Sequence, residues 1–189
     1  MADTREKLST VSVGLHWVIA LAMIGMVAFG LILEAMPRGE SKSGLLQIHK
    51  SIGALVLAVA LLRLVWRALQ GLPAHVGDYA AWEKVLAKAT HTFLLFATLA
   101  MPLTGIASSI GNARAINIFG FPFIPQLLAQ KNEAVAFWGQ ACHAVLGKLI
   151  IAAVLLHVAG ALKHHILDRD GTLKRMLGQR VAPTSTDHA

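Results

Sequence analysis

The stretch Gln140–Leu167, QACHAVLGKLIIAAVLLHVAGALKHHIL, decides the fold, because it is an apolar run of membrane length that histidines interrupt. His143 and His157 are fourteen residues apart, and at about 100° per residue that separation returns to within about 40° of the same helix face. The helical rise between them is about 21 Å. The stretch therefore predicts a transmembrane helix with one imidazole toward each side of a hydrocarbon layer about 30 Å thick.

The composition of the whole chain is that of a membrane protein. Of its 189 residues 56% are hydrophobic and 14% are charged, which lies outside the ordinary range of soluble domains. Four apolar runs exceed the ~20 residues that a spanning helix needs; they cover about 11–33, 47–69, 85–110 and 141–167. We therefore expect an all-α protein, a four-transmembrane-helix bundle that forms one membrane domain over residues 1–189.

The net charge of +7 reflects membrane topology rather than nucleic-acid binding, because the basic residues lie at helix ends and in short connections. If the amino terminus is inside, eleven of the lysines and arginines are inside and six are outside. The positive-inside rule then places both termini in the cytoplasm.

Two further histidines complete a paired pattern. His16 lies in the first apolar run, near its inner end, and His49 lies at the outer start of the second. His16 and His157 lie at the same predicted depth in the membrane, and so do His49 and His143. Two neutral imidazoles on facing helices form the arrangement that clamps a haem iron from both sides. The pattern therefore predicts two stacked haem sites, one toward each membrane face.

Small residues and the absence of a covalent attachment motif support this interpretation. Gly53 and Gly147 each follow a histidine by four residues, so bare backbone lies one turn inward, where a macrocycle can pack. The chain has no C-x-x-C-H run, so we expect any haem to be held by coordination alone. The only cysteine, Cys142, excludes an intramolecular disulfide and a thiolate cluster.

Three alternatives to haem remain open for these histidines. They could be isolated membrane histidines that bond to backbone carbonyls, they could form the proton path of a proton-coupled transporter, or they could bind a divalent metal. Ion-coupled transporters usually place a carboxylate deep in a span, whereas no Asp or Glu lies inside these four runs away from their end turns. The haem interpretation is therefore favoured.

His91 and His164 lie near the inner ends of the third and fourth runs. His164 follows His157 by seven residues, two turns along the same face. One hypothesis is a quinone headgroup site, which needs hydrogen-bond donors and a group that titrates near neutrality. The equal alternative is interfacial snorkelling. We expect His165 to point elsewhere, into water.

The ends of the runs give expectations about local structure. Ser9 or Thr10 is a suitable cap for the first helix, and Trp17 should lie at the wet inner interface. Arg63 and Arg67 should snorkel to the inner surface.

Residues 111–140, with FGFPFIP and NEAVAFWG, form the longest connection and should lie half-immersed over the outer face. Outer cations available to haem propionates are Arg38, Lys42, Lys50 and Lys148.

Five motifs resemble those of the bacterial diheme cytochrome b-561 family. They are GLHW at Gly14–Trp17, QIHKSIG at Gln47–Gly53, HTFLLF at His91–Phe96, P-x-x-G at Pro102–Gly105, and LLHVAGALKHHILDRDGTLKRML at Leu155–Leu177. Their order and mutual spacing match along nearly the whole chain. The resemblance implies two noncovalent haems b in a bacterial inner membrane protein, with His16 and His157 on one iron and His49 and His143 on the other.

The resemblance also implies a function in electron transport. Members of this family are electron carriers linked to the quinone pool, and one branch resembles an oxidoreductase that passes electrons from outer superoxide to ubiquinone. Related membrane cytochromes serve as the haem subunit of hydrogenases or other dehydrogenases. A cationic funnel on the outer side suits superoxide and a broad face suits a protein redox partner. The funnel is favoured weakly by Arg38, Lys42, Arg114 and Lys131.

Overall fold

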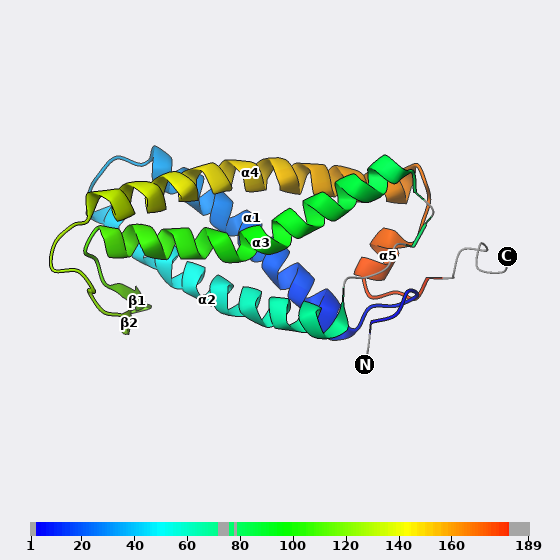
Figure 1. The fold of residues 1–189 in the computed structure, drawn as a ribbon, viewed down its shortest axis with the longest axis horizontal. Helices are drawn as coiled ribbons and strands as arrows, with labels where there is room; N and C mark the ends of the chain where they lie inside the picture. Colours follow the sequence, from blue (N-terminus) through cyan, green and yellow to red (C-terminus); the bar gives the residue numbers. More distant parts are fainter. Residues whose placement is uncertain (1–2, 72–75, 78, 182–189) are drawn as a thin grey trace. The chain divides into compact units, whose positions relative to one another are not determined.

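The computed structural model describes residues 3–71, 76–77 and 79–181. Among these residues, four helices are long and apolar enough to cross a membrane: α1 (Thr10–Ala35), α2 (Glu40–Gln70), α3 (Ala81–Gly111) and α4 (Glu133–Ile166) (Figure 1). A hairpin of β1 (Ile116–Ile118) and β2 (Phe121–Ile124) joins α3 to α4, and the short α5 (Thr172–Met176) follows α4. The expected all-α class with four transmembrane helices is confirmed.

Local capping sets the helix starts. The Ser9 hydroxyl accepts the backbone N–H of Ser12 at 3.2 Å, so Ser9 caps α1 as predicted. The Asn132 side chain likewise accepts the N–H of Val135 at 3.1 Å, and α4 begins at Glu133. NEAVAFWG is therefore largely helical, and its assignment to the connection was wrong because the asparagine cap was not recognised.

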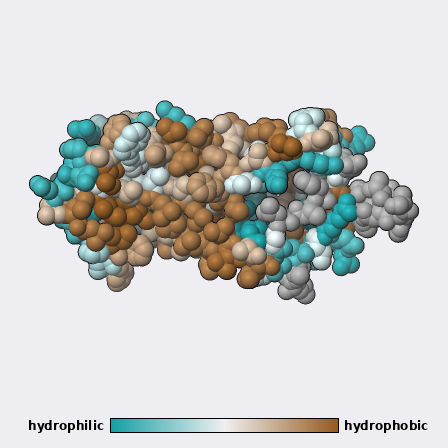
Figure 2. Space-filling model, in the orientation of Figure 1, coloured by the Kyte–Doolittle hydropathy of each residue, from teal (hydrophilic) through white to brown (hydrophobic). Residues whose placement is uncertain are grey.

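The helices turn apolar side chains outward. In the most apolar window of each helix only 6% to 17% of the residues are buried, and large side chains such as Leu21 and Leu155 are 66% exposed. The face in Figure 2 is accordingly covered largely by hydrophobic residues. Such a surface is stable in hydrocarbon rather than in water, so the chain is an integral membrane protein.

The chain forms two compact units, each with segments of all four long helices. Unit 1 consists of Met1–Val18, Leu62–Leu95 and Ala152–Ala189, and unit 2 consists of Ile19–Leu61 and Phe96–Ile151. Unit 1 contains His16 and His157, and unit 2 contains His49 and His143. Each predicted histidine pair therefore belongs to a single unit.

In unit 1 the two ends of the described chain pack together. The backbone N–H of Val181 donates to the carbonyl of Glu6 at 2.9 Å, and Arg175 donates to the carbonyl of Arg5 at 2.9 Å. The Trp17 indole donates to the Met176 carbonyl at 2.8 Å. Trp17 is 36% exposed, and α5 supplies the acceptor for its indole N–H; its position at the inner interface stays a prediction.

In unit 2 the hairpin is fastened to α2 through Ser51. Phe119 and Gly120 form its two-residue loop with φ of 48° and 91°, the left-handed pair that a type I′ turn needs. Ser51 is 2% exposed; its hydroxyl accepts the N–H of Phe119 at 2.9 Å and lies 3.2 Å from the carbonyl of Asn117. This bond fastens the hairpin to α2 two residues from His49, a histidine of the pair that is predicted to lie on the outer side.

We expect Ser51→Ala to loosen the hairpin without unfolding the helices. The substitution leaves the part-buried N–H of Phe119 without its acceptor, which costs about 1 kcal/mol or somewhat more, and about 1.4 kcal/mol corresponds to a tenfold change in an opening equilibrium. Hydrogen–deuterium exchange of residues 116–124 should therefore accelerate by up to about tenfold. Ser43→Ala, which removes an exposed bond to the Gly39 carbonyl, is the matched control. Equal exchange in the two variants would contradict the role of Ser51.

Candidate functional site

The structure brings the members of each predicted histidine pair face to face. The ring centroids of His16 and His157 are 6.2 Å apart, and those of His49 and His143 are 6.3 Å apart. Metal–imidazole bonds of about 2.0–2.1 Å place two rings on opposite sides of one metal with centroids about 6 Å apart. Both pairs therefore have the separation that a bis-histidine metal centre requires.

The hydrogen bond of His143 fixes the tautomer that binds metal. Its Nδ1 lies 3.0 Å from the carbonyl oxygen of Met101, and because a carbonyl can only accept, Nδ1 carries the proton. The lone pair of the neutral ring is then on Nε2. Metal-ligating histidines usually hold their second nitrogen in this way. Thr104 Oγ1, 3.1 Å from the same nitrogen, helps to fix the ring.

Bare backbone lies against both rings of the outer pair. A Cβ on Gly30 would lie 3.7 Å from Cε1 of His49, and one on Gly105 would lie 3.3 Å from Cε1 of His143. The His49 Nδ1 is buried without a hydrogen-bond partner among the described residues, a costly state for a polar atom. The residues of this site therefore fit a bulky group that binds imidazole.

The expected packing glycines face methionines in the structure. A Cβ on Gly53 would lie 3.8 Å from the Met26 methyl group, and one on Gly147 would lie 3.4 Å from the Met101 methyl group. Methionine side chains are flexible and adapt to irregular gaps. Their role beside a macrocycle remains a prediction.

A fourteen-residue spacing recurs on all four helices and organises both sites. The residues concerned are His16 and Gly30 on α1, His49 and Arg63 on α2, His91 and Gly105 on α3, and His143 and His157 on α4. Each helix thus contributes one residue to each site, four turns apart on the same face. The outer site has two histidines and two glycines, whereas the inner site has three histidines and an arginine.

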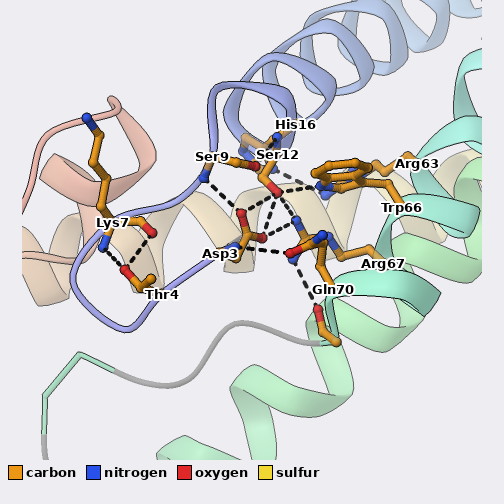
Figure 3. Close-up of polar contacts among 11 residues, drawn as sticks. Asp3, Thr4, Lys7, Ser9, Ser12, His16, Arg63, Trp66, Arg67 and Gln70 are labelled. Carbon is orange, nitrogen blue, oxygen red and sulfur yellow. Dashed lines mark hydrogen bonds and ion pairs between the residues drawn. The ribbon is translucent and has the colours of Figure 1, made fainter. Parts of the chain in front are cut away.

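The two arginines of α2 form polar contacts within unit 1. Arg63 Nη2 lies 3.3 Å from Nδ1 of His16, and Arg67 forms an ion pair with Asp3 at 2.7 Å, with side-chain exposures of 11% and 6%. Figure 3 shows both guanidinium groups pointing toward α1 and the N-terminal segment. The aspartate of that segment supplies the counterion of Arg67.

Asp3 and Arg67 share a third partner, Ser12, which lies one turn before His16. The Ser12 hydroxyl is 2.6 Å from Asp3 Oδ2 and accepts from the Trp66 indole at 2.7 Å and from Arg67. Burial raises the pKa of Asp3, but hydrogen bonds from Ser12 and Ser9 and the Arg67 guanidinium outweigh it, so the pKa is lowered to about 2.

We expect the Asp3 network to stabilise unit 1 at neutral pH. Because the folded-state pKa of about 2 lies below the ordinary value of 3.8, the stabilisation is complete above pH 4 and is lost as the pH falls toward 2. A shift of this size corresponds to about 2 kcal/mol. Thermal unfolding of wild type and Asp3→Asn should therefore differ most near pH 7 and converge in acid. A difference that does not depend on pH would contradict this assignment.

The structure places His91 and His164 in different surroundings. The ring of His91 lies 5.1 Å from that of His157, and the residue is exposed. Nδ1 of His164 lies 2.7 Å from an Asp168 carboxylate oxygen, and its ring lies 4.2 Å from that of Tyr79. His164 is thus held by a carboxylate and an aromatic ring. Nδ1 of His165, expected to be wet, is buried.

Beyond His164 the polar cluster continues through Tyr79. The Tyr79 hydroxyl donates to Asp170 and lies 3.0 Å from Thr172 Oγ1. Burial, followed by the bond to Asp170, raises the pKa of Tyr79. Its proton is therefore held firmly at neutral pH.

A membrane bundle that opposes two imidazole pairs at metal-ligating separation defines the class of b-type membrane cytochromes. The chain belongs to the prokaryotic cytochrome b561 family, whose sequence profile matches residues 7–179. It is therefore a membrane electron-transfer protein of a family that binds haem b, and the resemblance seen in its motifs is confirmed.

Three curated relatives extend over almost the whole chain. Cytochrome b561 homolog 2 of Escherichia coli (strain K12) is 31% identical over 180 residues, 94% of each chain. Cytochrome b561 homolog 1 of the same strain is 28% identical over 93% of this chain and 99% of its own. The probable superoxide oxidase CybB of Yersinia pestis is 27% identical over 93% of this chain and 98% of its own.

Proposed function

We propose that this protein transfers electrons across the membrane through two bis-histidine haems b, between a donor on the outer side and ubiquinone. His16 and His157 would hold the inner haem, and His49 and His143 the outer one. The observation that carries this proposal is the pair of centroid distances, 6.2 and 6.3 Å. Bound haem would supply one-electron redox chemistry, and a histidine pair on each haem would favour electron transfer because it would leave no position open to another ligand.

Helix α4 relates the two sites, because it carries a histidine of each. His143 and His157 lie in one uninterrupted helix, and the rise over fourteen residues is about 21 Å. The chain thereby provides a redox centre toward each face of the hydrocarbon layer. We further propose that both termini face the cytoplasm, with the inner haem on that side.

For the donor we propose superoxide, which is also the substrate named for the Yersinia pestis relative. Two cations of unit 2, Lys50 and Arg114, lie close enough to repel each other, and Lys50 is adjacent to His49. They would attract a small anion toward the outer site. Lys131 contributes less, because it is paired with Glu133 at 2.7 Å.

For the acceptor we propose a ubiquinone site beside the inner haem, formed by His91 and His164. A quinone carbonyl takes a hydrogen bond from imidazole, and each quinone accepts two electrons and two protons. His164 is suited to pass protons because Asp168 holds its Nδ1 at 2.7 Å, which leaves Nε2 for the ligand.

A haem count and a coupled assay test this function. Pyridine haemochrome analysis should give two extractable haems b per chain, and superoxide should reduce both and form ubiquinol. The superoxide rate should fall as salt rises, because screening weakens the attraction of an anion to Lys50 and Arg114. One haem per chain would refute the two-site function. Two haems that superoxide does not reduce would favour a protein donor, as in the haem subunit of a dehydrogenase.

A further inference from the structure

Among the residues that the structure describes, Arg63 forms no ion pair with a carboxylate in the inner site. Its guanidinium donates a hydrogen bond to Nδ1 of His16 at 3.3 Å, and the charge that acts on it most is another cation, Arg67. Arg67 itself is neutralised by Asp3 at 2.7 Å. A half-buried guanidinium beside neutral imidazoles is costly, whereas a carboxylate can satisfy two of its N–H groups at once. The inner site therefore lacks an anion.

The bond between Arg63 and His16 is incompatible with iron ligation by His16. A guanidinium only donates, so Nδ1 of His16 accepts and the proton of the neutral ring is on Nε2. If iron binds Nε2, the proton must move to Nδ1, and Arg63 cannot accept it. If iron binds Nδ1, the lone pair that Arg63 uses is taken. Ligation through either nitrogen therefore releases the Arg63 guanidinium.

The outer site has no arginine at the position equivalent to Arg63. The same spacing on α2 relates Arg63 to His49, so one helix face supplies a proposed ligand to the outer site and a cation to the inner one. At the other two such positions, Gly30 and Gly105 of the outer site correspond to His16 and His91 of the inner site. Among the four pairs of positions related by this spacing, the inner site is therefore the one that contains an arginine.

We propose that Arg63 binds a propionate carboxylate of the haem held by His16 and His157. This inference rests on the two-haem function proposed above. Haem brings carboxylates into the site together with its iron, so loading releases Arg63 from His16 and supplies its new partner in one event. The planar fork of arginine matches a carboxylate with two hydrogen bonds, which lysine cannot reproduce.

Two properties of the inner haem depend on the ion pair between Arg63 and the propionate. The ion pair slows loss of the haem, and the positive charge stabilises the reduced state relative to the oxidised one. In Arg63→Gln we expect the inner haem to pass to apomyoglobin at least tenfold faster, and its midpoint potential to shift negative, with the outer haem unchanged. Arg63→Lys should be intermediate for haem loss. Lys88→Gln, which removes an exposed charge from the same unit, should equal wild type.

Haem dimethyl ester identifies the anion. In apoprotein reconstituted with this ester the propionate charges are absent, so wild type and Arg63→Gln should lose the inner group at the same rate. If the tenfold difference persists with the ester, or if neither Arg63 variant loses normal haem faster, the inference is overturned. If Arg63→Gln does not fold, Arg63→Lys decides by the same comparison. One haem in the wild type would instead refute the underlying two-haem function.

Discussion

His157→Ala should yield a protein with half of the wild-type haem and no electron transfer to ubiquinone. The substitution removes one of the two imidazoles proposed to hold the inner haem, where the partner ring of His16 lies 6.2 Å away, and a single imidazole would hold haem b much less tightly. His143→Ala should remove the outer haem instead, which leaves exchange with quinol intact and abolishes reduction by superoxide. Pyridine haemochrome counts and a redox titration of each variant measure these losses.

The two variants must lose different components of the titration. Loss of the same component from both, or a full haem content in either, would contradict the assignment of ligands. His165→Ala is the matched control, because it removes an imidazole from the same helix at a position outside both pairs. Circular dichroism should show wild-type helicity in all three variants, since the four helices also pack through apolar contacts.

The transmembrane helices and the histidine pairs could be predicted because both depend on regular geometry. The length of an apolar run determines whether its helix can span the membrane, and a spacing of fourteen residues places two side chains on the same helix face. The ends of the helices were less predictable. The sequence predicted α2 from residue 47 and α4 from 141, whereas they begin at Glu40 and Glu133, because polar first turns and caps extend helices beyond their apolar parts.

The polar partners of the sites were missed because they depend on contacts between distant segments. Nothing in the composition of residues 3–9 indicates that Asp3 neutralises Arg67, 64 residues away in the chain. A sequence signal did exist for the inner site. The spacing that relates His143 to His157 also relates His49 to Arg63 and His91 to Gly105, and extending it to every helix predicts which residues line each site.

His164→Ala should slow quinone exchange by about a hundredfold while both haems remain. Loss of a positioned general acid or base typically costs about 10²–10⁴ in rate, and His164 is positioned by Asp168 at 2.7 Å and by the ring of Tyr79. Asp168→Asn should give a smaller loss, because it leaves the imidazole but removes the acceptor that orients it. The measurement is oxidation of ubiquinol by the haems in stopped flow, with superoxide reduction as the internal control.

His91→Ala distinguishes a quinone ligand from a neighbour of the inner haem. Its ring lies 5.1 Å from that of His157, so the substitution could alter the inner haem itself. If His91 binds quinone, quinone exchange should slow while the midpoint potential of the inner haem stays constant. If His91 only packs on His157, the main effect should instead be a shift in the midpoint potential of the inner haem.

Unchanged quinone kinetics in both His91→Ala and His164→Ala would exclude the inner site. The quinone would then belong on the outer side. There a pocket of about 280 Å³ lies between α2 and the hairpin, lined by Ser51, Asn117 and Phe119. In that case Ser51→Ala would be the variant expected to slow quinone exchange.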